Sequence, residues 1–163
     1  MKQGLFRIIE NKRLTDTVMQ MRLTGDTSAI TASGQFVNLL LSGKFLRRPI
    51  SVCDCEGDVL TLVYKIVGGG TEQMASMQEG ETLDVLTGLG NGYDLSFAGD
   101  RPLLLGGGVG VPPMYMLAKQ LIARGKDVTV ILGFNTADEV FYKDEFEALG
   151  ARVYVTTVDG SAG

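Results

Sequence analysis

Residues 103–113, Leu-Leu-Leu-Gly-Gly-Gly-Val-Gly-Val-Pro-Pro, have the composition of a turn that receives a phosphate. The leucines predict a buried strand, the glycines allow close approach of a ligand to the backbone, and Pro112 and Pro113 suit the first turn of a helix. Such a helix start presents free N–H groups and the positive end of the helix dipole to an anion. The turn therefore predicts a nucleotide ligand. Val111 replaces the third glycine of the dinucleotide fingerprint, so a purely structural turn is the alternative.

A second glycine run, Gly68-Gly69-Gly70-Thr71, follows a predicted strand and precedes a short predicted helix at 72–77. Thr71 suits the N-cap of that helix. Successive N–H groups in a glycine turn before a helix form a nest for an anion. A flexible hairpin loop is the alternative.

The segment Arg47-Arg48-Pro49-Ile50-Ser51 precedes that run by about one pair of strands. Pro49 cannot donate to a central ladder, which predicts an edge or ligand-facing strand. Arg48 can form a bidentate pair with a phosphate, and Ser51 can bond the polar edge of a ring. A solvated basic edge that discourages aggregation is the alternative.

The chain has no histidine and two cysteines, Cys53 and Cys55. The absence of histidine argues against a Ser-His-Asp or Cys-His nucleophile. Two cysteines without histidine are too few ligands for a zinc site. If the chain is part of an enzyme, we expect a cofactor to supply the chemistry. No side-chain acid or base is assigned a catalytic role. At i and i+2 in a strand the two cysteines should share one face and should not bridge, as in a reduced compartment.

The net charge of −4 comes without a block of lysine or arginine, which argues against nucleic acid or an anionic membrane as a partner. No apolar run approaches the roughly 20 residues of a membrane span, and the N-terminus has no signal-peptide core. We expect a cytoplasmic protein.

Two patterns of elements divide the chain. Up to about residue 98, short strands are predicted at 5–10, 17–23, 36–41, 50–55, 59–67 and 82–86, which suggests a small antiparallel barrel or sandwich. From residue 103 the order becomes strand 103–106, helix 112–124, strand 127–133, helix 139–149 and strand 151–158, which predicts a parallel sheet. We expect a barrel at 1–99 and an α/β unit at 100–163. The Gly-Asn-Gly turn at 90–92 is read as structural.

The α/β unit is short, because doubly wound nucleotide domains carry five or six strands. The sequence from Asp159 to Gly163 has a loop composition. We therefore expect the chain to be a C-terminally truncated fragment, with an incomplete nucleotide domain. Residues 133–139, where the ribose contact is expected, contain no Arg or Lys, which favours NAD over NADP.

Taken together, these stretches resemble the ferredoxin-reductase-like family, in which a flavin-binding barrel precedes a nicotinamide-binding α/β domain. Arg48-Pro49-Ile50-Ser51 is similar to the Arg-x-Tyr-Ser motif of that family, Gly70-Thr71 to its pyrophosphate loop, and Gly90-Asn91-Gly92 to a turn before its linker. Within the family, the motifs look most like those of the electron transfer subunits of NAD-dependent dihydroorotate dehydrogenases, including Gly-Phe-x-x-x-Asp-Glu-Val-Phe at 133–141.

The resemblance implies two cofactor sites. Arg48 would hold an FAD phosphate, the backbone of Pro49 and Ile50 with Ser51 would meet the flavin, and Gly70 and Thr71 would cradle the pyrophosphate. Lining residues for the FAD would be Val63, Tyr64 and Lys65. The nicotinamide nucleotide would be received by Gly107, Gly108 and Gly110.

The implied function is electron transfer in pyrimidine biosynthesis: from dihydroorotate oxidation in a partner catalytic subunit, through a [2Fe–2S] cluster and FAD, to NAD⁺. A heterotetramer with that subunit is expected. Family members hold the cluster with four cysteines in a C-terminal segment, which Cys53 and Cys55 cannot supply. Ile50 also stands where most members carry an aromatic residue. Two alternatives remain open: a related flavin reductase subunit for another partner, glutamate synthase-like or sulfide-linked, and a nucleotide-binding module without turnover.

Overall fold

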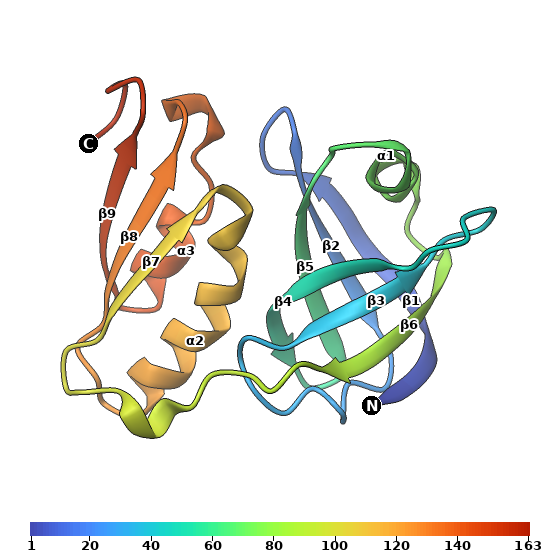
Figure 1. Cartoon of the computed structure of the whole chain (residues 1–163), viewed down its shortest axis with the longest axis horizontal. Coiled ribbons are helices and arrows are strands. Elements are labelled where there is room, and N and C mark those ends of the chain that lie inside the picture. Colours follow the sequence, from blue (N-terminus) through green and yellow to red (C-terminus); the bar gives the residue numbers. More distant parts are fainter.

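A computed structural model describes all 163 residues. The N-terminal part is a closed antiparallel barrel with the strand order β1-β2-β5-β4-β3-β6. Its strands are β1 (Lys2–Arg13), β2 (Val18–Thr24), β3 (Phe36–Leu40), β4 (Arg48–Glu56), β5 (Val59–Lys65) and β6 (Thr82–Leu89). Helix α1 (Gly69–Ser76) lies over one end of the barrel, between β5 and β6 in the chain (Figure 1). Closure removes the sheet edges that an open antiparallel sheet would expose.

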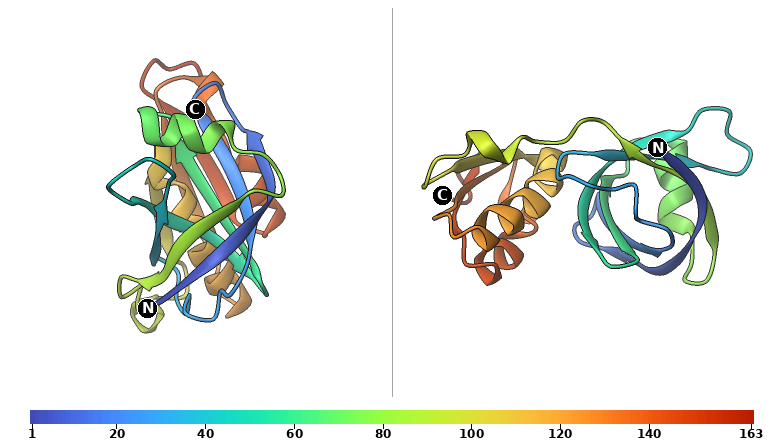
Figure 2. Two further views of the ribbon diagram at one scale, coloured as in Figure 1. Left: turned by 90° about the vertical axis from the view of Figure 1, so that its right-hand side faces the viewer. Right: turned by 90° about the horizontal axis from the view of Figure 1, so that it is seen from below.

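The C-terminal part is a parallel sheet in the order β7-β8-β9. Strands β7 (Leu103–Gly107), β8 (Thr129–Phe134) and β9 (Arg152–Thr157) are connected by α2 (Pro112–Ala123) and α3 (Lys143–Ala148). Short 3₁₀ turns occur at η1 (Leu95–Phe97), η2 (Gly108–Gly110) and η3 (Ala137–Glu139). Both helices cover the same face of the sheet, and α2 lies between the sheet and the barrel, where it packs against β4 (Figure 1). The right-hand view of Figure 2 shows the two units side by side with the barrel seen nearly end-on.

Two apolar clusters hold the molecule together. One fills the barrel and includes Phe6, Ile8, Leu39 and Leu62. The other lies between the parallel sheet and its helices, and it also takes in three side chains from the outer surface of the barrel, Val18, Cys53 and Val63. The α/β unit is therefore packed onto the barrel through a shared core rather than joined to it by the linker alone.

These elements confirm the predicted fold class, an antiparallel barrel followed by a short parallel α/β sheet. Helix α2 ends close to the predicted position 124, where Gly125 has φ of 75° and its N–H donates to the carbonyl of Ile122 at 2.8 Å. No helix of the structure is long and apolar enough to span a membrane.

The single helix predicted at 139–149 is wrong. The segment is divided into η3 and α3 because Tyr142 adopts a left-handed conformation, with φ of 67°. A left-handed residue interrupts the right-handed hydrogen-bond ladder. Burial explains the departure, since the Tyr142 ring is 6% exposed and packs on Tyr115, Phe141 and Phe146.

The shared face predicted for Cys53 and Cys55 is also wrong. Strands β4 and β5 shift register between Val52 and Asp54, so one additional residue interrupts the alternation of β4. A bulge of this kind reverses which face the following side chains occupy. Cys53 consequently packs with the α/β unit, while Cys55 packs against the barrel core, and both thiols are free.

Candidate cofactor sites

Strands β4 and β5 diverge at one end of the barrel and leave a pocket of about 330 Å³. Their ladder begins at Val52 and Leu62, so residues 48–51 pair only with β3 on the other side. Backbone groups on the open side of β4 are left for a ligand, and a planar heteroaromatic ring can use them. The pocket gathers eight of the residues predicted for FAD, namely Arg48, Pro49, Ile50, Ser51, Val63, Tyr64, Lys65 and Thr71, together with Val67 and Val109.

The N-terminus of α1 lies at the end of this pocket next to two cationic side chains. A Cβ atom built on Gly70 would lie 2.1 Å from Nε of Arg48, so the guanidinium rests against the bare backbone of Gly70. The ammonium of Lys44 lies 3.4 Å from the corresponding position on Gly69. Two cations thus meet the positive end of a helix dipole, and this arrangement favours a phosphate or pyrophosphate.

Thr71 serves α1 in a different position from the one predicted. It is the third residue of the helix, and Gly68 takes the N-cap position, so the predicted Thr71 N-cap is wrong. Its hydroxyl accepts from the N–H groups of Val67 (2.9 Å) and Gly68 (3.3 Å) and donates to the carbonyl of Gly68 (3.0 Å). The hydroxyl is fully engaged, so Thr71 can offer a ligand its backbone N–H, as Gly69 and Gly70 can.

The three predicted residues of β5 face different ways. Val63 packs toward the α/β unit and Tyr64 into the barrel core, and they are 4% and 2% exposed. The Tyr64 hydroxyl donates to Oδ1 of Asn11 at 3.2 Å, and burial raises the pKa of Tyr64 to about 12. Only Lys65 at the end of the strand carries a polar side chain to the pocket surface.

A second pocket, of about 510 Å³, lies at the carboxyl ends of the three parallel strands. It is lined by Gly107 and Gly108 after β7, by Gly133 to Asn135 at β8, by 156–158 at β9, and by Lys65, Val109 and Glu139. The carboxyl edge of a parallel sheet is the usual position for a nucleotide in open α/β folds. Gly108 has φ of 50°, a conformation that favours glycine, while Gly110 faces open space and does not line this pocket.

The free N–H groups predicted at the start of α2 do not exist. Pro112 and Pro113 have no N–H, and the N–H groups of Val111 and Met114 donate to Gly108 and Val111 at 3.1 and 3.0 Å. All four N-terminal donors of that helix are absent or satisfied. The glycine turn that precedes α2, rather than the helix itself, is the surface that a nucleotide would contact.

Glu139 supplies a carboxylate to the second pocket. Its Oε2 accepts from Nδ2 of Asn135 at 2.8 Å, which fixes the carboxylate beside the end of β8. An acidic group at this place suits the hydroxyls of a ribose and repels a 2′-phosphate.

Lys65 and Val109 line both pockets, so the two sites share a wall at the junction of barrel and sheet. Lys44, Val109 and Glu139 were not individually predicted. Lys44 could not be predicted from the glycine pattern. It lies in the connection between β3 and β4, and only the folded chain brings its ammonium near Gly69. Glu139 was detectable as the acidic residue after the second parallel strand.

No group of three or more His, Cys, Asp or Glu side chains could hold a metal ion in this structure. An iron–sulfur cluster needs four thiolates, and Cys53 and Cys55 lie on opposite sides of β4. The residues of this chain do not fit such a cluster.

Comparisons with known proteins show which chains resemble this one. Residues 104–159 match the family model described as "Oxidoreductase NAD-binding domain". The dihydroorotate dehydrogenase B (NAD(+)) electron transfer subunit of Geobacillus sp. (strain WCH70) is 43% identical over 171 aligned residues, covering 100% of this chain and 66% of the relative. The subunit of the same name from Fusobacterium nucleatum is 44% identical over 162 residues and covers 94% and 62%. The chain thus spans slightly less than two thirds of these relatives.

Solved structures give the same fold. An NADH-dependent reduced ferredoxin-NADP oxidoreductase superposes with a TM-score of 0.86 at 32% identity, covering 98% of this chain and 59% of the other. A ferredoxin NADP⁺ reductase from Neisseria gonorrhoeae, with bound FAD and NADP, has a TM-score of 0.83 at 24% identity and covers 100% and 70%. The chain shares the fold of these ferredoxin-NADP reductase-like proteins. Its sequence is similar over nearly its whole length to the dihydroorotate dehydrogenase B electron transfer subunits.

Proposed function

We propose that this chain is the flavin- and nicotinamide-binding part of an electron transfer subunit of NAD-dependent dihydroorotate dehydrogenase. Its partner is a catalytic subunit that oxidises dihydroorotate, and its electron acceptor is NAD⁺. The observation that carries this proposal is the shared wall of the two pockets, because two cofactors bound on either side of Lys65 and Val109 would lie next to one another. In this proposal 1–99 is the FAD-binding domain and 100–163 is part of the NAD-binding domain.

The residues of the first pocket fit FAD. Gly70 leaves the space that the guanidinium of Arg48 occupies, and Lys44 and the N–H groups of 69–71 converge on the same place. Arg48 would bond a phosphate, while the open side of β4 at Pro49, Ile50 and Ser51 would bond the ring system. When bound, FAD supplies the exchange of electrons with NAD⁺ as hydride. The chain would bind and orient the two cofactors and exclude water from between them, and no side chain would transfer a proton.

The second pocket suits NAD. Gly107 and Gly108 leave the floor of the pocket bare for the nucleotide backbone, and Gly110 extends the same turn. Glu139 would accept from the ribose hydroxyls. Lys65 would face the pyrophosphate from the barrel side.

The first experiment is reconstitution of the purified chain with FAD, followed by anaerobic addition of NADH. Flavin absorbance that survives dialysis and is bleached by NADH supports the proposal. A chain that binds NADH but retains no flavin would instead be the nucleotide-binding module. The partner is tested separately, by asking whether dihydroorotate reduces NAD⁺ when the complete subunit is mixed with the catalytic subunit.

A related flavin reductase subunit for a glutamate synthase-like or sulfide-linked partner would give the same result in the flavin assay. The names of the 43% and 44% identical relatives favour dihydroorotate dehydrogenase. We also propose a cytoplasmic location, which free thiols at Cys53 and Cys55 support.

A further inference from the structure

The contact between the barrel and the α/β unit combines an apolar core with a few directional polar bonds. Val18, Cys53 and Val63 supply the barrel's share of the apolar part. Apolar burial is non-directional, so it keeps the two units together but defines their relative rotation less sharply than hydrogen bonds do. Hydrogen bonds and ion pairs across the junction add contacts with defined geometry.

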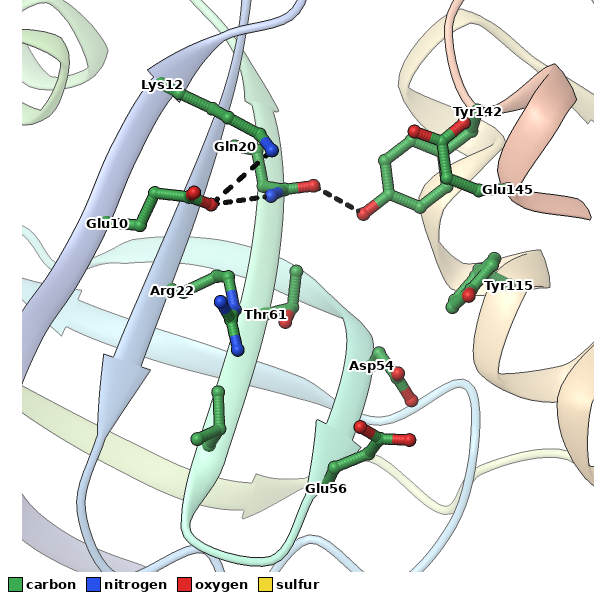
Figure 3. Close-up of a pocket in the computed structure, with 11 residues that line it drawn as sticks. Glu10, Lys12, Gln20, Arg22, Asp54, Glu56, Thr61, Tyr115, Tyr142 and Glu145 are labelled. Carbon is green, nitrogen blue, oxygen red and sulfur yellow. Dashed lines mark hydrogen bonds and ion pairs between the residues drawn. The ribbon is translucent and has the colours of Figure 1, made fainter. Parts of the chain in front are cut away.

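Tyr142 makes the buried polar contact between the two units. Its hydroxyl donates to Oε1 of Gln20 on β2, at 2.8 Å, and Figure 3 shows the ring directed from the α/β side toward the barrel. Burial raises the pKa of this hydroxyl, so it stays a neutral donor. Tyr142 is also the only residue other than glycine with positive φ, and such a conformation persists only where the surroundings enforce it.

The acceptor of this hydrogen bond is itself held in place. Nε2 of Gln20 donates to Oε2 of Glu10 at 3.0 Å, and Lys12 lies 3.6 Å from the same carboxylate oxygen. The amide orientation of Gln20 is thereby set from the barrel, with its oxygen directed at Tyr142 (Figure 3).

A second polar connection lies farther along the same junction. Nζ of Lys119 on α2 is 2.9 Å from Oδ2 of Asp54 and also pairs with Glu56 on β4. A polar cleft of about 300 Å³ lies beside both connections and is lined by Arg22, Thr61, Tyr115 and Glu145 among others. Besides the apolar core, two polar connections therefore cross the junction, and an open cleft lies beside them.

We propose that Tyr142 is a positioning residue whose hydrogen bond to Gln20 fixes the orientation of the α/β unit on the barrel. Lys119 supports the same orientation through Asp54 and Glu56. The two cofactor pockets belong to different units, since residues 48–51 lie on the barrel and Gly107 and Gly108 on the sheet. Rotation of one unit would change the distance between their occupants, and hydride transfer falls steeply when reacting atoms are misplaced by about 1 Å. This kinetic consequence rests on the proposed function, whereas the orientation itself does not.

The direct test measures residual dipolar couplings of backbone N–H groups in the whole chain, without ligand. One alignment tensor should fit both the barrel and the parallel sheet in the unaltered protein. Tyr142→Phe removes one hydroxyl and keeps the ring, and Gln20→Met removes the same bond from the other side. Either variant should require different tensors for the two units, and Lys119→Met should add to the difference.

Tyr154→Phe is the matched control, because that ring is 57% exposed on β9 and faces away from the barrel. It should leave a single tensor. If both Tyr142→Phe and Gln20→Met also retain a single tensor, the proposal is wrong. The two variants approach the bond from different elements, so failure of one to fold leaves the other to decide.

The second readout is flavin reduction by NADH in stopped flow, with FAD bound. Tyr142→Phe should lower the rate at saturating NADH about tenfold, with less than a twofold change in the Kd of NADH. It should also weaken the long-wavelength charge-transfer absorbance of stacked flavin and nicotinamide. An unchanged rate and band in Tyr142→Phe overturn the kinetic part. If the unaltered chain shows no reduction at all, the proposed function fails, and the dipolar couplings still decide the role of Tyr142.

Discussion

Arg48 and Gly70 depend on one another, although 22 positions separate them in the chain. The guanidinium occupies the space that any side chain at residue 70 would need. Each residue alone has an ordinary explanation, as an edge cation or a loop glycine. Their contact makes both part of the proposed FAD site, with the phosphate expected beside the guanidinium and the backbone of Gly70.

Arg48→Ala should weaken FAD binding about 10- to 150-fold, because a lost charge-assisted hydrogen bond costs roughly 1.5–3 kcal/mol. Fluorescence titration of FAD measures the change. Arg7→Ala, an exposed arginine on β1, is the control and should bind FAD normally. Equal affinities for the two variants would place the FAD phosphate elsewhere.

Gly70→Ala should separate binding from stability. The new Cβ displaces the end of a flexible arginine side chain rather than backbone, so the melting temperature should change by only about 2 °C. FAD affinity should fall about tenfold, because the Arg48 guanidinium is displaced from its position against residue 70. Gly99→Ala, where no atom lies within 4 Å, is the control for the added methyl group. An unchanged FAD affinity in Gly70→Ala would show that the contact between Arg48 and Gly70 does not contribute to FAD binding.

Cys53 should make the unfolding free energy depend on alkaline pH. Burial raises the pKa of its thiol from 9.0 to about 12 in the folded state. The folded protein therefore holds a proton that the unfolded chain releases first, and the stabilisation is complete below pH 9 and lost between pH 9 and 12. Each pH unit above 9 should cost up to about 1.4 kcal/mol. Urea unfolding of the protein and of Cys53→Ala should diverge over this range, and parallel curves would contradict the assignment.

At the scale of elements, helix α1 is held from its C-terminal end. Nδ2 of Asn11 on β1 donates to the carbonyls of Met74 and Met77, both at 2.9 Å, and its Oδ1 accepts from Tyr64. These carbonyls are among the groups that a helix leaves unsatisfied at its end. The N-terminal end of α1, where the FAD phosphate is proposed to bind, is therefore positioned in part by Asn11 of β1.

Asn11→Ala should lower the unfolding free energy by about 1–3 kcal/mol, since two partly buried carbonyls lose their donor. For a chain of this size the melting temperature should fall by roughly 2–4 °C per kcal/mol. FAD affinity should fall as well, because α1 is no longer fixed. Asn38→Ala on β3, whose side chain makes no hydrogen bond, is the control, and calorimetry with FAD titration is the measurement. A stable Asn11→Ala with normal affinity would show that α1 is held by other contacts.

At the scale of the whole molecule, the parallel sheet is covered on one face only. Leu104, Val130 and Leu132 are buried under the helices, whereas Leu103 and Leu105 are 53% and 64% exposed on the other face. Tyr154 lies on the same open face, beside Ile131 and Leu105. Purely parallel sheets usually have both faces covered, so this apolar surface is unusual for an α/β unit.

Replacing Leu103 and Leu105 together by serine should reduce the fluorescence of an apolar dye such as ANS. The melting temperature should stay within about 2 °C, because exposed positions contribute little to the core. Leu5→Ser, at a 71% exposed site on the barrel, is the control and should change dye binding little. Unchanged dye fluorescence in the double variant would mean that the open face is not the binding surface.

Local sequence signals were sufficient for most of the strands and for α2. Short strand-like segments separated by turn residues predicted the barrel strands, and Gly125 and the paired prolines marked the two ends of α2, because these signals act within a few residues. Tertiary contacts decided where local signals failed. Packing around Tyr142 interrupted the predicted helix at 139–149, and the bulge at Val52–Asp54 sent Cys53 and Cys55 to opposite faces.

The sequence by itself determined where an arginine- and proline-bearing strand and two glycine turns lie, since arginine, proline and glycine have fixed local chemistry. Only the tertiary structure brought Lys44 and Arg48 to Gly69 and Gly70, showed that α2 has no free N–H to offer, and placed Lys65 and Val109 between the two pockets. The physical reason is that these relations depend on barrel closure and on packing between distant segments. Neither barrel closure nor this packing can be predicted from local composition.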